Sequence, residues 1–227
     1  MFTLTGWDLG FLTVLLFGPA IWSSFSEVRA FAGEDQKRED PGAYGVKENL
    51  QALAMQLLQL FLAIGYLIFR GFDFSNLVLE WNISALLWGV GLFLLAGFLM
   101  DLWNGFSDGF SWIPNFLKEN IPLLDALRDT DLSLGVYSVL NGVYEEFFFL
   151  CMITAVKPEF LPIAFAFSLL IRFLFHTYQG VGTAMGMTLI LGVGFFVLYT
   201  GGMDNLLIFF VAHALCDFFG MSLINLL

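Results

Sequence analysis

Seven apolar runs of 18 to 25 residues dominate the chain, with polar stretches between them. Each is long enough to cross the roughly 30 Å hydrocarbon core of a bilayer as a helix. None shows the alternating pattern of a membrane-spanning β-strand, and backbone polar groups in lipid must be satisfied within the element. The pattern therefore predicts an all-α fold, a polytopic transmembrane bundle of about seven helices, with eight as the alternative. The expected spans are 8–25, 50–69, 83–100, 132–156, 160–178, 181–199 and 206–226.

Two longer connections interrupt these runs. Residues 26–49 are the most polar stretch and predict a solvated loop. Residues 101–131 mix aromatic and charged side chains, which favours an amphipathic segment along the membrane interface, a re-entrant or eighth helix being the alternative. No internal repeat divides the sequence, so residues 1–227 are expected to form a single integral membrane domain.

Basic residues gather in these same two connections, and cytoplasmic loops are typically rich in Lys and Arg. With an odd number of helices, this distribution predicts an N-terminus outside and a C-terminus in the cytoplasm. Arg70 and Lys157 lie on the opposite side and oppose this orientation. The residues that favour it are Arg29, Lys37, Arg38, Lys47, Lys118 and Arg128.

Composition narrows the possibilities further. With 59% hydrophobic and 13% charged residues, the chain cannot be a soluble domain. A net charge of −11 argues against nucleic acid as a partner and leaves the lipid bilayer as the expected environment. Cys151 and Cys216 both fall within apolar runs, where thiols usually pack as small apolar groups. The oligomeric state is not predicted.

Ionisable side chains concentrate in the last four apolar runs. Each charged group near the bilayer centre costs roughly 2.5 to 3.5 kcal/mol on insertion scales, so several of them require partners or a polar cavity. A water-accessible active site is the preferred interpretation, and a structural network of paired charges or an ion or solute path are the alternatives. The residues are Glu145, Glu146, Arg172, His176, His213 and Asp217.

Their spacing predicts local geometry. Arg172 and His176 are four residues apart and share a helix face, as do His213 and Asp217. In the second pair, the carboxylate could bind one imidazole nitrogen and orient the other. Adjacent Glu145 and Glu146 point about 100° apart and can still line one pocket.

Charge counting leaves the cofactor open. Three carboxylates and one Arg sum to −2, which a divalent metal or two protons would balance. His176, His213 and Glu145 form an acceptable zinc set, but no His-Glu-x-x-His helix arranges them in advance. Chemistry without a cofactor is therefore preferred, with zinc as the alternative.

These residues resemble the CAAX protease and bacteriocin-processing enzyme (CPBP) family of intramembrane proteases, also called the ABI family. The resemblance covers residues 132–226 and rests on Glu145-Glu146, His176 and the segment His213 to Asp217. The family places an Arg four residues after the second Glu of the pair and a Phe four residues before the first His. Here Leu150 occupies the place of that Arg, and Arg172 that of the Phe.

The resemblance implies an intramembrane endopeptidase that cuts a membrane-associated substrate, such as a peptide precursor, a sorting anchor or a CAAX-like tail. In such an enzyme Glu145 would activate a water, assisted by Glu146, and His176 and His213 would stabilise the oxyanion. Asp217 would orient His213, and Arg172 would support the site electrostatically. The alternatives are a zinc-dependent protease with the same residues, a non-enzymatic membrane immunity or scaffold protein, and a proton-coupled transporter.

Overall fold

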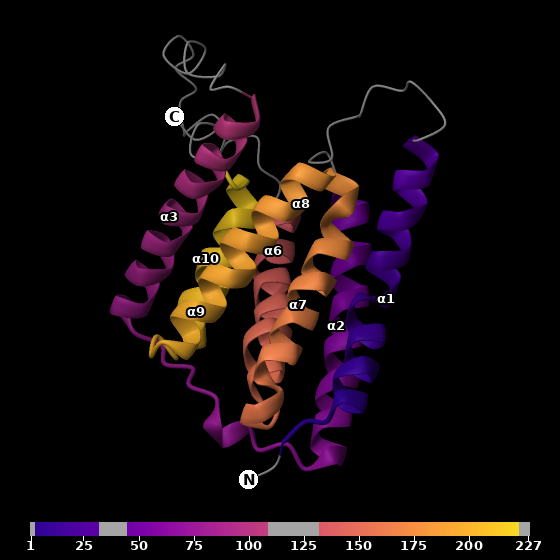
Figure 1. Cartoon of the computed structure of the whole chain (residues 1–227), viewed down its shortest axis with the longest axis vertical. Coiled ribbons are helices and arrows are strands. Elements are labelled where there is room, and N and C mark those ends of the chain that lie inside the picture. The colour runs from indigo at the N-terminus through magenta and orange to yellow at the C-terminus, as the bar shows by residue number, and fades with distance from the viewer. Residues whose placement is uncertain (1–2, 32–44, 109–131, 223–227) are drawn as a thin grey trace.

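The structure, a computed structural model, describes residues 3–31, 45–108 and 132–222 as a bundle of helices that alternate in direction (Figure 1). α1 begins at the end of the bundle opposite to the one where α10 ends. Short 3₁₀ turns η1 (Phe74–Asn76), η3 (Pro158–Phe160) and η4 (Thr177–Gln179) join some of the helices. The long elements are α1 (Gly6–Phe31), α2 (Val46–Arg70), α3 (Ile83–Asp108), α6 (Leu132–Glu146) with its π-helical continuation η2 (Phe147–Met152), α7 (Leu161–His176), α8 (Val181–Met187), the π-helical η5 (Thr188–Val193), α9 (Gly194–Thr200) and α10 (Leu206–Phe219).

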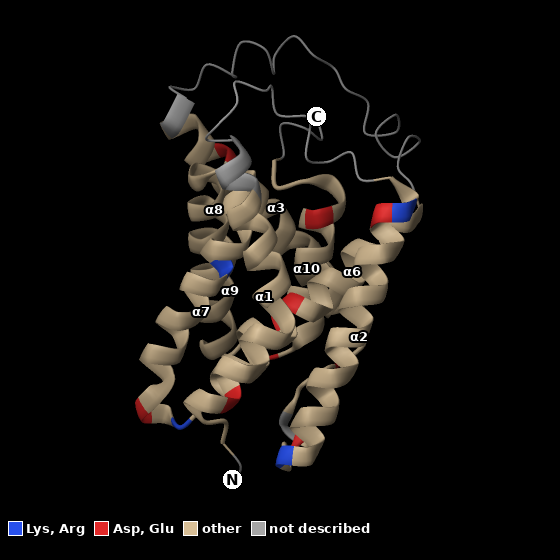
Figure 2. Ribbon diagram, turned by 90° about the vertical axis from the view of Figure 1, so that its right-hand side faces the viewer, with Lys and Arg blue, Asp and Glu red and all other residues tan. Residues whose placement is uncertain are grey.

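The predicted fold class is confirmed. Helices α8, η5 and α9 form one continuous rod, as do α6 and η2, so the described residues contain seven rods. Five segments are long and apolar enough to cross a membrane: 6–26, 46–70, 83–106, 158–179 and 181–200. α10 is apolar but only 14 residues long, and the α6 rod, which carries the Glu pair, is not among the five. Among the described residues, charged ones lie mainly near the ends of the bundle, with a few at mid-height (Figure 2).

Several element ends differ from the predicted ones. α1 continues to Phe31 and α2 begins at Val46, so both ends of the predicted 26–49 loop are helical. α3 likewise extends to Asp108, eight residues beyond its predicted end. α10 ends at Phe219, where Gly220 adopts a positive φ of 80°, a common device for ending helices. Residues 32–44 and 109–131, with most of the predicted loop and interfacial segment, lie outside the described residues.

α10 packs mainly between α6 and α3, and glycines permit this close approach. A Cβ built on Gly142 of α6 would lie 2.8 Å from the carbonyl oxygen of Phe210 and 2.9 Å from the backbone nitrogen of Ala214. On α3, a Cβ at Gly89 would lie 2.7 Å from Val211 Cβ. Small residues at membrane helix interfaces let backbones approach in this way. Gly142 therefore brings the Glu pair within reach of His213.

At the other end of the bundle, an ion pair joins α1 to α2. Asp8 is buried, and its carboxylate binds Arg70 Nε at 2.7 Å and the Tyr66 hydroxyl at 2.6 Å. Thr5 donates its backbone N–H and its hydroxyl to the same carboxylate. Four donor groups thus hold Asp8 at the beginning of α1. One of them belongs to Arg70, whose position in the sequence opposed the predicted membrane orientation.

We expect Gly142→Ala to destabilise the protein by about 1–3 kcal/mol, because the new methyl group meets backbone atoms that cannot move independently of α10. Gly91→Ala is the matched control, since nothing lies within 4 Å of a Cβ at that position. The free energy of unfolding in mixed detergent micelles measures both. Equal stability of the two variants would contradict the proposed packing.

Candidate active site

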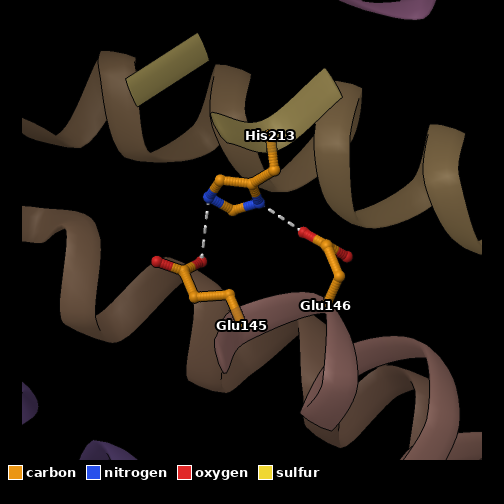
Figure 3. A group of neighbouring side chains, drawn as sticks. All are labelled: Glu145, Glu146 and His213. Atoms are coloured by element: carbon orange, nitrogen blue, oxygen red, sulfur yellow. Dashed lines mark hydrogen bonds and ion pairs between the residues drawn. The ribbon is translucent and has the colours of Figure 1, made fainter. Parts of the chain in front are cut away.

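Glu145, Glu146 and His213 form the centre of the buried polar group (Figure 3). The imidazole of His213 on α10 lies between the two carboxylates of α6, with Nδ1 2.5 Å from Glu146 Oε1 and Nε2 3.6 Å from Glu145 Oε2. The three side chains are at most 5% exposed. Both adjacent glutamates thus face the same imidazole, and the π-helical turn of η2 begins immediately after them.

Arg172 of α7 contributes the positive charge of the site. Its Nη2 donates to Glu146 Oε1 at 2.8 Å, and its Nη1 lies 3.9 Å from Glu145 Oε2. The guanidinium thus lies within 4 Å of both glutamate carboxylates. Its central carbon also lies 4.1 Å from the ring centroid of Phe149 in η2, a favourable cation–π distance. Gly192 of η5 packs against α7 beside this side chain, where a Cβ would lie 2.8 Å from Leu169 Cδ2 and in ordinary contact with Arg172 Cδ, at 3.4 Å.

Asp217 and His213 are closer to other partners than to each other. Asp217 Oδ1 lies 3.6 Å from His213 Nε2, which is beyond hydrogen-bond distance. The nitrogen Nδ1 instead contacts Glu146, so Glu146 is the carboxylate that orients His213. Within the i,i+4 pair, the imidazole rotates toward α6 because α6 approaches α10 so closely at Gly142. Asp217 is the most exposed carboxylate of the group, at 18%.

Asp217 and Glu145 share a hydrogen-bond donor. Asn141 of α6 donates from Nδ2 to Glu145 Oε1 at 2.9 Å and to Asp217 Oδ2 at 2.7 Å. Its own Oδ1 accepts from Gln56 Nε2 of α2 at 2.5 Å. The sequence analysis missed both amides. The position of Asn141, four residues before Glu145, could have revealed it, whereas nothing in the sequence marks Gln56.

His176 lies at the end of α7 and is buried. Its Nδ1 is 2.8 Å from the carbonyl oxygen of Arg172. Because a carbonyl only accepts hydrogen bonds, Nδ1 carries the proton and the neutral ring presents Nε2 as an acceptor. Among the described residues, His176 forms no ion pair with a carboxylate, and it lies outside the group of possible metal ligands, which contains Glu146 instead.

An aromatic cluster closes one side of the polar group. Phe17 of α1 lies with its ring centroid 5.0 Å from those of Phe148 and Phe175 and 5.1 Å from that of Phe149. Ser24 of α1 donates to the carbonyl oxygen of Phe175 at 2.7 Å and fixes α1 against α7. Helix α1 therefore supplies an apolar wall that keeps bulk water from the charges.

Three buried polar atoms face one another across this group without hydrogen-bond partners in the described part of the chain. They are Glu145 Oε2, Arg172 Nη1 and His213 Nε2. Glu145 Oε2 lies 3.9 Å from Arg172 Nη1 and 3.6 Å from His213 Nε2. An acceptor and two nitrogens arranged in this way can bind a polar group that both donates and accepts.

We expect Arg172→Leu to reduce the free energy of unfolding by about 3–5 kcal/mol, because it leaves Glu146 as a buried charge without its cation. Adding Glu146→Gln should recover part of this loss. Arg172→Lys should be intermediate, since an ammonium cannot reproduce the planar guanidinium. Arg70→Leu is the control, because Asp8 keeps its bonds to Tyr66 and Thr5, and a smaller loss is expected in the same detergent unfolding assay.

An Arg172→Leu variant as stable as the wild-type protein would show that the buried pair does not stabilise the bundle.

One family comparison bears on this site. Residues 130–219 match the family described as Rce1-like, type II CAAX prenyl endopeptidase Rce1-like. The matched segment contains the Glu pair, Arg172, both histidines and Asp217. Searches of curated proteins and of solved structures return no match. Over the second half of the chain, the recognition made from the motifs is thus confirmed: these helices are similar to the Rce1-like type II CAAX prenyl endopeptidases, which is consistent with the CPBP family and implies a protease of the membrane.

Proposed function

We propose that the protein is an intramembrane endopeptidase in which Glu145 activates a water molecule for attack on a peptide bond. The observation that supports this proposal best is Glu145 Oε2, a buried carboxylate oxygen without a hydrogen-bond partner in the described residues, directed toward two nitrogens. A general base needs such an oxygen within hydrogen-bond reach of the attacking water. Glu145 would accept the water's proton and then donate it to the leaving amine.

Glu146 serves a different role in this proposal. Its Oε1 is held by both Arg172 and His213. A carboxylate held in this way is a poorer proton acceptor than Glu145, because hydrogen bonds to the charged form stabilise it. We assign to Glu146 the orientation of His213 and Arg172, so that the two adjacent glutamates differ in function.

The developing oxyanion requires donors. Arg172 Nη1 is unpartnered among the described residues and lies beside Glu145, so a carbonyl oxygen bound there would face the attacking water. His213 Nε2 can donate to the same oxygen while its ring carries both protons, a state that three surrounding carboxylates favour. His176 can contribute from Nε2 only as an imidazolium, since its Nδ1 proton is committed to a backbone carbonyl. Asp217 would stabilise the charge of His213.

The substrate would be a membrane-associated peptide or protein, in keeping with the family match. Candidates are a peptide precursor, a sorting anchor and a CAAX-like tail. Asp217 is the most exposed carboxylate of the site and lies in the last turn of α10, so we propose that substrate approaches from that end of the bundle. We further propose that this end faces the cytoplasm, because the 26–49 and 101–131 connections carry most of the basic residues.

We expect Glu145→Gln to lower activity at least about a hundredfold while the protein remains folded, because the amide cannot accept the proton; losing one essential group typically costs roughly 10² to 10³ in rate. Glu159→Gln is the matched control, since Glu159 is exposed in η3. Cleavage of a quenched fluorescent peptide that ends in a farnesylated CAAX sequence measures activity. Comparative membrane proteomics of cells with either variant identifies uncut natural substrates. Near-normal cleavage by Glu145→Gln would refute the mechanism.

A zinc-dependent protease is the second candidate, because Glu145, Glu146 and His213 offer ligand atoms within 4.8 Å of one another. We favour the mechanism without metal, since Arg172 already supplies a positive charge 2.8 Å from Glu146 Oε1, where a metal ion would compete with it. Metal analysis of the purified protein should therefore find less than about 0.1 equivalent of zinc, and a chelator should leave activity unchanged. Stoichiometric zinc that is lost in Glu146→Gln would favour the metalloprotease.

A further inference from the structure

Asn141 occupies a central position among the polar side chains of the site. Its amide is buried, and both its nitrogen and its oxygen form hydrogen bonds. Nδ2 donates to Glu145 and Asp217, and Oδ1 accepts from Gln56. The orientation of the amide follows from its partners. Ionised carboxylates accept only, and the Gln56 amino group donates, so exchanging the nitrogen and the oxygen of Asn141 would create three repulsive contacts.

The two donations of Asn141 have different consequences for Glu145 and Asp217. On Glu145, the amide occupies Oε1 and leaves Oε2 directed at Arg172 Nη1 and His213 Nε2. On Asp217, it holds Oδ2 while Oδ1 remains 3.6 Å from His213 Nε2. One neutral group therefore determines which oxygen of each carboxylate faces the imidazole, and it reduces the repulsion between two buried anions.

We infer that Asn141 is a positioning residue of the reaction, which aims Oε2 of Glu145 at the attacking water. The inference rests on the proposed function of Glu145. An amide has no proton to exchange at working pH, so Asn141 acts through Glu145 and Asp217 and does not take part in the proton transfer itself. Gln56 of α2 donates a hydrogen bond to this amide and holds it in place, so α2 also contributes to the arrangement of the site.

A purely structural role would have a different signature. The bonds of Asn141 also join α2, α6 and α10, and this alone could explain a buried amide. The chain offers a matched control for that possibility: Asn49 of α2 is equally buried and donates to Ser133 of α6 at 3.0 Å, across the same pair of helices. Asn49→Leu removes a hydrogen bond between α2 and α6 and leaves the contacts of the carboxylates unchanged.

The experiment compares Asn141→Leu, Asn141→Asp and Asn49→Leu in the full-length protein in detergent micelles. Asn141→Asp keeps the shape and the acceptor for Gln56 but replaces the donor with an oxygen. With the farnesylated CAAX peptide as the probe, we expect both Asn141 variants to lower kcat at least about thirtyfold, with KM within about threefold. Asn49→Leu should lower kcat less than about twofold, although its unfolding free energy falls as much as that of Asn141→Leu.

A second measurement needs no substrate. Dicyclohexylcarbodiimide modifies protonated carboxyl groups in apolar surroundings, and mass spectrometry quantifies the labelled peptide that contains Glu145. Because a donated hydrogen bond favours the ionised carboxylate, Asn141→Leu should increase the labelling rate of Glu145 at least about fivefold at neutral pH. Asn49→Leu should leave this rate unchanged.

The outcomes separate the inference from the proposed function. Equal losses of kcat in Asn141→Leu and Asn49→Leu, with unchanged labelling of Glu145, would reduce Asn141 to a contact between helices. Altered labelling in Asn141→Leu together with full activity of Glu145→Gln would uphold the hydrogen bond but refute the base. If the wild-type protein does not cut the CAAX peptide, the labelling rates alone decide the position of Asn141.

Discussion

The arrangement of the second half of the bundle depends on one buried interaction, the contact of Glu146 with both Arg172 and His213. In an apolar bundle, a carboxylate without partners would carry a desolvation penalty of several kcal/mol. Helices α6, α7 and α10 therefore have to meet at this point. Gly142 permits the approach of α10, and Gly192 permits that of η5 to Leu169 of α7. Backbone packing and charge pairing thus depend on each other.

This interaction also gives the adjacent residues Glu145 and Glu146 different surroundings, although their side chains are chemically identical. Each glutamate retains one oxygen without a hydrogen-bond partner in the described residues, but Oε1 of Glu146 is held by both Arg172 and His213, whereas Oε1 of Glu145 accepts only from the neutral amide of Asn141. The difference arises from the helical rotation of about 100° between adjacent residues, which directs Glu146 onto Arg172 and His213 and leaves Glu145 beside Asn141 of its own helix. A single Glu-Glu pair can in this way provide both a rigid anchor and a base.

The surroundings of the site differ on its two sides. Phe17, Phe149 and Phe175 form an apolar wall from α1, η2 and α7. The opposite side is polar, with the amides of Gln56 and Asn141 leading to the partly exposed Asp217. Water and substrate polar groups are better accommodated on the second side. Such an asymmetry is compatible with the proposed hydrolysis within a membrane, because charges in a partly desolvated site interact strongly.

Hydropathy was sufficient to predict the helical bundle, and the cost of charges in lipid made the six ionisable residues of its second half conspicuous in the sequence. The family was suggested by the resemblance of these residues to known motifs, and the match over residues 130–219 agrees with it. Only the tertiary structure decided which partners meet. His213 turns to Glu146 instead of Asp217, although Asp217 shares its helix face, because the distance between α6 and α10 depends on Gly142. Asn141 and Gln56 were overlooked for a related reason: an uncharged amide in an apolar run resembles an ordinary polar residue until the helices bring its partners together.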